Sequence, residues 1–439
     1  MSFTSLLAAH GFDQMRLLRH PKAGFELRIA RTFDPGIDWS VLGCDLWCDR
    51  LPCEDPITLG DRAARDLFRS ADLADDLGQL EAEMDAGGHE LLIVDHETRL
   101  GLTAALAVHS SRLGARRGRH ALRAGGVRLH SPREPQVESL KDALRLARAM
   151  SYKNTAAELP VGGAKMVVVA DRLVADDLPR LGFIARCIES GRFLAGPDVG
   201  FGGPLIDAIR AHFSRHIVGG SEGPSGGTNG PTAIGCFAAM EEAARHVFGP
   251  AGLHGRTVAL QGLGGVGSQL AGLLRGAGAR LVAADPDEQA LRSVAARIGS
   301  FDIVAPAQIL TTECDLLSPC ALGPVVSRDL IPELRCRMIY GAANNQLAAT
   351  STAEELGLAE QLAQRGILFQ VEWTYNFGGV IAGVDEYLTG GTPAGALEAA
   401  ITELARRNTR EILAEAARTG RTPTAVAYDR VARRLAEQR

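Results

Sequence analysis

Lysine is rare in this 439-residue chain, and two of its lysines stand in one short segment. Of the 47 basic side chains only four are lysines, namely Lys22, Lys141, Lys153 and Lys165. An arginine keeps its charge at any working pH, whereas a buried lysine can lose its proton, and its compact charge fits where a guanidinium does not. Lys153 and Lys165 are therefore the first candidates for catalytic chemistry.

A glycine motif in the second half of the chain has the context of a dinucleotide-binding turn. Gly262, Gly264 and Gly267 follow an apolar segment typical of a strand and open a segment typical of a helix. A second strand is predicted over 280–284 and ends at Asp285. The first glycine permits a tight turn, the second lets the backbone approach a pyrophosphate, and the third allows close packing of helix on strand.

A dinucleotide bound there would place its pyrophosphate on the helix N-terminus, beside Gly265 and Val266. Asp285 would accept hydrogen bonds from both ribose hydroxyls and repel a 2′-phosphate, so the sequence favours NAD over NADP. We also assign Thr232, at the start of a helix predicted over 232–248, to the cofactor site. An α/β turn of the same shape without a ligand is the alternative.

The elements that must position these residues alternate between helix and strand, which is typical of an α/β fold. An amphipathic helix is predicted over 137–150, just before Lys153, and a buried strand over 166–170, just after Lys165. A loop rich in Gly, Ser, Pro and Asn over 219–230 is the predicted hinge.

We therefore predict two domains, an N-terminal α/β domain for substrate binding and oligomerisation and a Rossmann dinucleotide-binding domain, with C-terminal helices. Paired strands around a Gly turn are expected near 15–30 and again near 91–108. The predicted divisions are an N-terminal extension of unclear role (1–88), a substrate-binding and catalytic domain (89–228), an NAD-binding domain (229–383) and C-terminal helices that pack back on the first domain (384–439).

The amino-acid composition indicates which kinds of binding partner to expect. The chain is 46% hydrophobic and 23% charged, which is ordinary for a globular protein. A net charge of -5 supplies no basic face for nucleic acid or an anionic membrane, and no apolar run is long enough to span a bilayer. The first residues lack the charged start of a secretory signal. We expect a cytoplasmic homo-oligomer that acts on a small molecule.

The eight cysteines are too sparse for a disulfide scaffold and are expected to be thiols. Cys44, Cys48 and Cys53 invite comparison with a zinc site, but a fourth ligand and tighter pairing are missing. We predict buried thiols there and no metal site.

Several motifs together carry a family resemblance. The order of these motifs resembles that in the glutamate, leucine, phenylalanine and valine dehydrogenases, and is closest to the leucine/phenylalanine/valine branch. The resemblance extends from about His89 to the C-terminus. The first 88 residues lie largely outside it. The matching segments are Met150-Ser151-Tyr152-Lys153-Asn154, Gly162-Gly163-Ala164-Lys165, Pro197-Asp198-Val199-Gly200, Gly262 to Gly267, Cys314 to Gly323, Ala342 to Leu347 and Asn376 to Val380.

The resemblance implies oxidative deamination of an amino acid to its 2-oxo acid and ammonia, with NAD as hydride acceptor. Lys153 is similar to the lysine that holds the substrate α-carboxylate. Lys165 resembles the catalytic lysine, which must be neutral to activate a water, and Asp198 resembles the carboxylate that accepts and returns a proton of the amino group. Asn345 resembles a residue near the nicotinamide ribose and carboxamide, with Asn344 less certain.

The resemblance also bears on which amino acid is bound. A glutamate dehydrogenase would place a lysine before Gly125-Gly126, where this chain has Ala124, and a serine where it has Gly383. A distal carboxylate would then be buried without a partner, which costs several kcal/mol. The small pocket residues Gly196 and Gly383, with Val380, favour a bulky apolar or aromatic substrate.

Three alternatives remain open from the sequence. The substrate could be a branched-chain amino acid, or glutamate, because Arg128-Leu129-His130 looks closer to that branch. Phe201 and Phe377 could either stack on a substrate ring or refill the pocket. A non-catalytic NAD-binding regulatory or scaffold protein is the alternative of another class, suggested by the divergent stretches 223–230 and 372–375.

Overall fold

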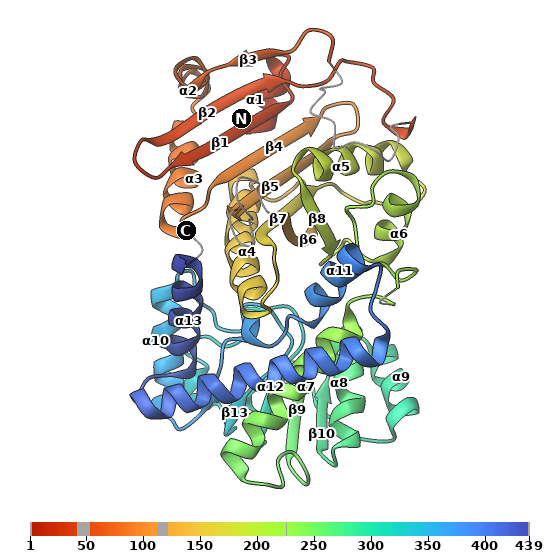
Figure 1. Cartoon of the computed structure of the whole chain (residues 1–439), viewed down its shortest axis with the longest axis vertical. Helices are drawn as coiled ribbons and strands as arrows, with labels where there is room; N and C mark the ends of the chain where they lie inside the picture. The colour runs from red at the N-terminus through yellow and green to blue at the C-terminus, as the bar shows by residue number, and fades with distance from the viewer. Residues whose placement is uncertain (1, 42–52, 112–121, 225, 438–439) are drawn as a thin grey trace.

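The computed structural model describes residues 2–41, 53–111, 122–224 and 226–437. In this part of the chain, two sheets and their helices form two domains, with the N-terminal one uppermost in Figure 1. The predicted α/β class with two domains is confirmed. Cys44 and Cys48, which were considered as metal ligands, lie outside the described residues.

The N-terminal domain is built on a mixed sheet of eight described strands in the order β3-β2-β1-β4-β5-β7-β6-β8. Two antiparallel hairpins, β1–β2 and β4–β5, occur where the sequence predicts paired strands. β6 lies between β7 and β8 and runs parallel to both. The strands are β1 (Gln14–His20), β2 (Gly24–Arg31), β3 (Ile57–Leu59), β4 (Leu91–Glu97), β5 (Leu102–Ser110), β6 (Arg123–His130), β7 (Gly162–Val169) and β8 (Phe193–Pro197).

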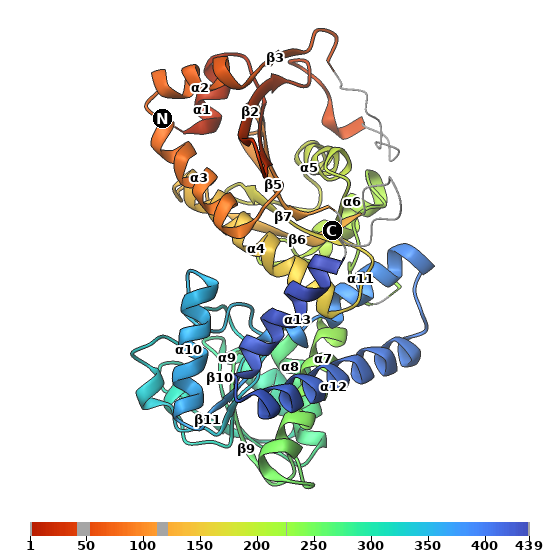
Figure 2. The same ribbon diagram turned by 60° about the vertical axis from the view of Figure 1, so that its left-hand side comes forward.

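Residues 1–88, for which the sequence predicts no role, extend this sheet, because β1 pairs with β4. Helices α1 to α4 share one apolar core with one face of the sheet, and α5 and α6 share a second core with the other face (Figure 2). These helices are α1 (Phe3–Ala9), α2 (Asp61–Ser70), α3 (Ala74–Gly87), α4 (Gln136–Ala156), α5 (Leu178–Ser190) and α6 (Gly203–His212), with the 3-10 turn η1 (Trp39–Val41) on the α5 side.

The second domain has a parallel sheet of six described strands in the order β11-β10-β9-β12-β13-β14. Its first strand lies inside the sheet and the chain continues outward on both sides, which is the Rossmann arrangement. Ligands of such sheets bind where the strand order reverses, here at the carboxyl end of β9. The strands are β9 (Thr257–Gln261), β10 (Arg280–Ala284), β11 (Asp302–Ile303), β12 (Leu316–Pro319), β13 (Met338–Ile339) and β14 (Leu368–Phe369).

The helices of this half include two that return to the first domain. Asn408 on α12 donates from Nδ2 to the carbonyl oxygen of Ala156 (2.9 Å), and Arg434 on α13 donates to that of Thr155 (3.1 Å), at the end of α4. Figure 1 shows α13 rising toward the upper domain. The helices are α7 (Asn229–Phe248), α8 (Gly265–Gly276), α9 (Glu288–Ile298), α10 (Thr352–Gln364), α11 (Gly378–Thr389), α12 (Ala394–Thr419) and α13 (Pro423–Glu437), with 3-10 turns η2 (Ile309–Thr311), η3 (Ile331–Glu333) and η4 (Glu372–Thr374).

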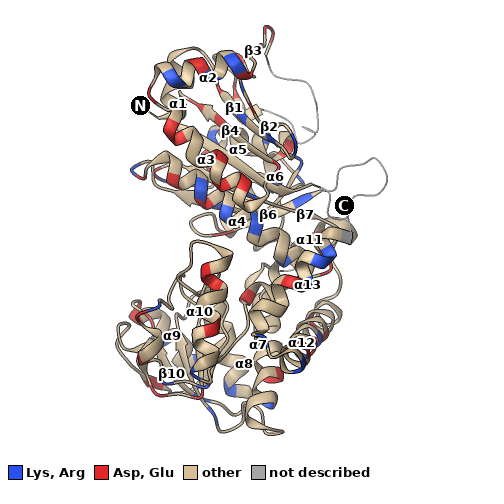
Figure 3. Cartoon of the chain, turned by 90° about the vertical axis from the view of Figure 1, so that its left-hand side faces the viewer, with Lys and Arg blue, Asp and Glu red and all other residues tan. Residues whose placement is uncertain are grey.

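Acidic and basic residues are interspersed over both domains, as Figure 3 shows. None of the helices in the described ranges combines the length and apolar character that a membrane-spanning segment requires.

Close packing of α4 on the sheet positions the candidate lysines. Met166 and Val168 of β7 belong to the α5-side core, whereas Val167 belongs to the α4-side core. Because side chains alternate along a strand, Lys165 shares the α4 side with Val167. A side chain at Gly163 would overlap the backbone of Ser151 on α4, so this glycine allows the helix to approach the strand.

We expect Gly163→Ala to lower the free energy of unfolding by about 1–3 kcal/mol, the usual cost of overpacking a buried contact. Urea unfolding followed by tryptophan fluorescence measures the change. Gly78→Ala is the matched control, because nothing lies near its added methyl group and alanine favours a helix interior by roughly 0.5–1 kcal/mol. Equal stability of both variants would contradict the packing argument.

Candidate active site

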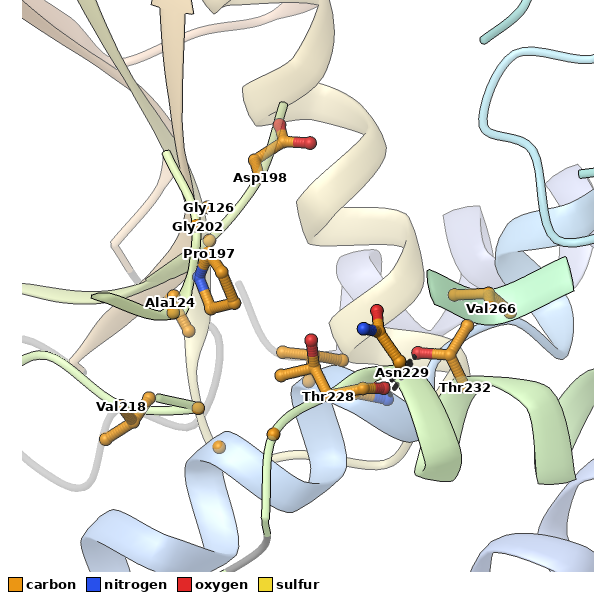
Figure 4. A pocket seen from close by; sticks show the side chains of 18 of the residues that line it. Ala124, Gly126, Pro197, Asp198, Gly202, Val218, Thr228, Asn229, Thr232 and Val266 are labelled. Carbon is orange, nitrogen blue, oxygen red and sulfur yellow. Dashed lines mark hydrogen bonds between the residues drawn. The ribbon is translucent and has the colours of Figure 1, made fainter. Parts of the chain in front are cut away.

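A cavity of about 630 Å³ lies between the two domains. Strands β6, β7 and β8, the end of α4, the N-terminus of α7 and one face of α11 line it. In Figure 4, Ala124, Pro197, Asp198 and Val218 lie on one side, and Thr228, Asn229 and Thr232 lie on the other. The charged residues among the described lining are Lys153, Lys165 and Asp198.

Lys165 and Asp198 form an ion pair across the middle strand of three. Lys165 belongs to β7, Asp198 follows β8, and Gly126 lies between them on β6. A side chain at Gly126 would stand 2.9 Å from Lys165 Nζ and 2.9 Å from Asp198 Cβ. The absence of a side chain at this position is therefore what lets the amine reach the carboxylate.

Burial and charge act in opposite directions on this pair. Burial alone would raise the pKa of Asp198, but the charges of Lys165 and Arg128 outweigh it and hold that pKa well below its usual range. Burial lowers the pKa of Lys165, which is 5% exposed; the Asp198 charge opposes this shift and the Arg128 charge adds to it. The amine thus loses its proton more easily than a solvated lysine does.

Arg128 is a second cation in contact with Asp198. Its Nε donates to Asp198 Oδ2 (3.2 Å), the same oxygen that Lys165 contacts, and its Nη1 donates to Asp142 Oδ2 (3.2 Å). His130 Nε2 lies 3.0 Å from that Asp142 oxygen, and this hydrogen bond raises the pKa of His130. In the sequence, Arg128 is only a mark of the family branch, because its contact with Asp198 depends on strand order.

Lys153 projects from α4 into the same cavity. Its Nζ donates to Asn344 Oδ1 (3.0 Å), which also accepts from Asn376 Nδ2 (3.1 Å). Burial lowers the pKa of Lys153 to about 8, and the nearby Glu372 carboxylate opposes that shift. The second domain thus supplies polar partners for a lysine of the first.

The assignment of Asn345 to the nicotinamide side of the cavity needs correction. Asn345 has a φ of +51°, and its backbone N–H donates to Glu372 Oε1 (2.8 Å). This left-handed turn directs Asn345 to a separate small cavity behind α4, whereas the preceding Asn344 lines the main cavity. The two neighbours cannot be told apart from sequence, because the turn geometry alone decides which one faces the substrate side.

One end of the cavity is apolar. Ala124, Leu194, Val218 and Val384 form a small buried cluster there, against which Val380 packs. Among the sequence candidates, Gly125, Gly126, Gly196, Val380 and Gly383 all line the cavity. Leu194 in β8, Val218 in a loop and Val384 on α11 are not among the sequence candidates, because an apolar residue in such places carries no distinctive signal.

Phe201 and Phe377, considered as stacking partners for a substrate, are fully buried in the cores of the first and second domains respectively. Neither ring belongs to the cavity lining. Both fill domain interiors, so the space at the apolar end is left to the small residues.

The glycine turn lies at the carboxyl end of β9, where the strand order reverses. A side chain at Gly267 would overlap the backbone of Gly262, which has a φ of +89°, whereas the space beside Gly264 is open. No side chain caps the N-terminus of α8 in its described surroundings. Asp285 directly follows β10 and accepts from the backbone N–H of Leu263 through Oδ2 (2.6 Å).

These observations fit a dinucleotide, because the helix start is uncapped, the approach to Gly264 is unobstructed, and an acidic side chain stands beside the turn. Val266 and Thr232 connect this turn to the main cavity, whose lining includes both. Thr232 Oγ1 donates to the Thr228 carbonyl oxygen (2.8 Å). Gly265 lies at the start of α8, next to Asn229.

Comparisons with known proteins agree with this geometry. The model of the Glu/Leu/Phe/Val dehydrogenase dimerisation domain matches residues 96–215. The leucine dehydrogenase of Thermoactinomyces intermedius is 33% identical over 309 residues, which cover 70% of this chain and 80% of that protein. The valine dehydrogenase of Streptomyces coelicolor is 36% identical over 308 residues, covering 69% and 80%.

This chain belongs to the Glu/Leu/Phe/Val dehydrogenase family. The family resemblance in the sequence is confirmed, and the chain is an amino-acid dehydrogenase, an oxidoreductase acting on CH–NH₂. Among solved structures, the L-tryptophan dehydrogenase from Nostoc punctiforme has a TM-score of 0.64 and 27% identity, covering 81% of this chain and 98% of that one.

For this dehydrogenase, we expect Gly126→Ala to fold but to lose about 10²-fold in kcat. The added methyl group would displace the Lys165 amine, and a misplacement of about 1 Å can cost that much. Steady-state kinetics and thermal unfolding measure both effects. Gly357→Ala on α10 is the control, because nothing lies within 4 Å of its added methyl group and it does not belong to the described cavity lining. A fully active Gly126→Ala variant would refute this geometry.

Proposed function

We propose that this dehydrogenase catalyses the NAD-dependent oxidative deamination of a bulky apolar or aromatic L-amino acid to its 2-oxo acid and ammonia. The observation that carries the proposal is the cavity itself, which joins Lys153, Lys165 and Asp198 to an apolar end made of small residues. The reaction is reversible, since each proton transfer has its reverse on the same groups.

The apolar end argues against glutamate. Apart from Lys153 and Lys165, which the mechanism uses, the described lining offers no cation for a distal carboxylate. A side chain at Gly383 would also stand 2.9 Å from Val218 Cγ2, so a hydroxyl-bearing residue would not fit there without a shift. A buried carboxylate without a partner costs several kcal/mol, so an apolar side chain is the better occupant.

The size of the space supports a large substrate over a small one. Ala124, Gly196 and Gly383 add little volume at the apolar end, and a methyl group at Gly196 would still find only ordinary contacts. An aromatic ring buries a large apolar area, which favours phenylalanine or tryptophan over valine. The tryptophan dehydrogenase likeness points the same way, whereas the leucine and valine dehydrogenase relatives favour branched-chain substrates as the second candidate.

In the proposed mechanism, the Lys153 ammonium pairs with the substrate α-carboxylate and fixes the orientation of Cα. Lys165 and Arg128 both contact Asp198 Oδ2, which leaves Oδ1 for the substrate amino group. Bound NAD supplies the acceptor for the hydride that leaves Cα, and Gly262, Gly264, Gly265, Val266, Gly267, Thr232 and Asp285 would hold it.

Asp198 then accepts a proton from the amino group, and its negative charge disappears. Because that charge is the largest one opposing the lowered pKa of Lys165, the lysine now releases its proton to solvent more readily. Neutral Lys165 takes a proton from a water whose oxygen attacks the imine carbon. Asp198 returns its proton to the nitrogen of the resulting carbinolamine and then accepts the hydroxyl proton as the C–N bond breaks, so that the 2-oxo acid and ammonia are released.

Asp285 supports NAD as the cofactor. Its Oδ1 accepts from the Asp287 N–H (2.8 Å) and its Oδ2 from the Leu263 N–H (2.6 Å), so the carboxylate is fixed beside the glycine turn. A 2′-phosphate would meet this negative charge. We also propose a homo-oligomer, because the family domain that matches residues 96–215 is a dimerisation domain.

We expect NAD reduction with L-phenylalanine or L-tryptophan, weaker reduction with leucine or valine, and none with glutamate. The near-ultraviolet absorbance of the reduced cofactor, recorded for each amino acid with NAD and with NADP, measures this. Preference for leucine or valine would move the assignment to the branched-chain candidate. Reduction with glutamate would refute the argument from the apolar cavity end.

We expect Lys165→Ala to lose about 10²–10⁴-fold in kcat, the usual contribution of a positioned acid–base group. Folding and NAD binding should be retained, as circular dichroism and cofactor fluorescence can verify. Lys22→Ala, at an exposed turn between β1 and β2, is the matched lysine control and should be fully active. Normal turnover by Lys165→Ala would exclude the proposed mechanism.

A further inference from the structure

Glu372 is a buried carboxylate that the proposed mechanism does not use. It begins η4 in the second domain and is 3% exposed. Its Oε1 accepts from the Asn345 N–H (2.8 Å), while its Oε2 is buried without a hydrogen-bond partner among the described residues. An ionised carboxylate in that state is costly unless a cation stands nearby.

Lys153 is the cation whose charge acts on Glu372, without a direct ion pair among the described contacts. The Glu372 charge raises the pKa of Lys153, and the Lys153 charge lowers the pKa of Glu372. The two are also joined through the backbone, because Glu372 holds the turn at Asn345 while the neighbouring Asn344 accepts from Lys153 Nζ (3.0 Å). One carboxylate thus influences both the position and the charge of the lysine.

A second carboxylate, that of Glu355, lies near Glu372 and interacts with it electrostatically. Glu355 on α10 lines the small cavity behind α4 together with Glu372, and it contacts the Tyr428 hydroxyl on α13. Burial, together with the Glu372 charge, raises the pKa of Glu355 to about 7. The Arg148 charge on α4 acts in the opposite direction on Glu355.

The other titratable groups near Glu372 and Lys153 are either neutral or part of the candidate active site. Cys236 on α7 and Tyr375, beside η4, lie near Glu372, and burial holds the pKa of both well above its usual range. Lys165 and Asp198 act on Lys153 with opposite signs. Among these groups, Glu372 is therefore the carboxylate outside the catalytic pair that supports the charge of Lys153.

We propose that Glu372 is a positioning residue that keeps Lys153 protonated and oriented for the substrate carboxylate as the pH rises. The inference rests on the proposed function, in which Lys153 binds that carboxylate. Since burial raises the pKa of Glu372, its charge develops as the pH rises toward the range in which Lys153 would lose its proton. Each charge then stabilises the other, and carboxylate binding extends to higher pH.

The test uses Glu372→Gln in the full-length enzyme. Glutamine can still accept the Asn345 N–H, so the variant removes the charge and keeps the turn. The readout is the competitive inhibition constant of 3-phenylpropanoate, which has a carboxylate but no amine, between pH 6.5 and 9.5. If the pKa of Lys153 falls by about one unit, inhibition weakens about eightfold at pH 8.5 and less than about twofold at pH 6.5.

A merely structural role predicts a different result, because loss of turn support would weaken inhibition equally at every pH or leave it unchanged. Either outcome for Glu372→Gln overturns the proposal. Glu355→Gln gives a second test with Glu372 intact. This variant removes a like charge, so Glu372 ionises at lower pH. The pH at which inhibition by 3-phenylpropanoate is lost should then equal that of the wild type or be higher. A move to lower pH overturns the proposal.

Lys153→Met separates the two hypotheses. If this variant binds 3-phenylpropanoate as tightly as the wild type at pH 6.5, the role of Lys153 in the proposed function is wrong. If it binds weakly while Glu372→Gln matches the wild type at every pH, the role of Lys153 stands and the inference about Glu372 is wrong.

Discussion

The buried ion pair between Lys165 and Asp198 is the interaction on which the site depends. Two charges leave water only where their attraction and further hydrogen bonds offset the loss of hydration. Here the offset requires three strands in a fixed order, with Gly126 bare in the middle, and a second cation, Arg128, on the same carboxylate oxygen. The ion pair requires the strand order, the bare glycine and the second cation together, and the first domain supplies all three.

Helix α4 connects that pair to the rest of the molecule. Its body packs on the sheet through the contact between Gly163 and Ser151, and its last turns carry Lys153 into the cavity. The second domain meets this end of the helix with Asn344, and α12 and α13 bind its final carbonyl groups. In the proposed mechanism, the substrate carboxylate is therefore held by a lysine of one domain whose position depends on the other domain.

Two features of the cavity bear on which substrate suits it: its charged residues and its apolar end. Its three charged residues gather where an amino acid keeps its amino and carboxyl groups, and its other end is a cluster of small and aliphatic side chains. Gly383 allows α11 to approach Val218, so the small residue serves packing as well as space. In the proposed mechanism, Lys153, Lys165 and Asp198 contact groups that every amino acid shares, so a change at the apolar end alone would change which side chain is accepted.

The sequence by itself determined the family, the two-domain α/β fold, the glycine turn and the chemistry-bearing types Lys153, Lys165 and Asp198, since each depends on local spacing or on residue type. Only the tertiary structure decided that Arg128 reaches Asp198, that Asn344 rather than Asn345 faces the cavity, and that Phe201 and Phe377 lie in the cores. Residues 1–88 carried no motif, yet they supply β1 to β3 of the first sheet. Strand order and the direction of one turn fix these features, and both arise from contacts between residues far apart in sequence.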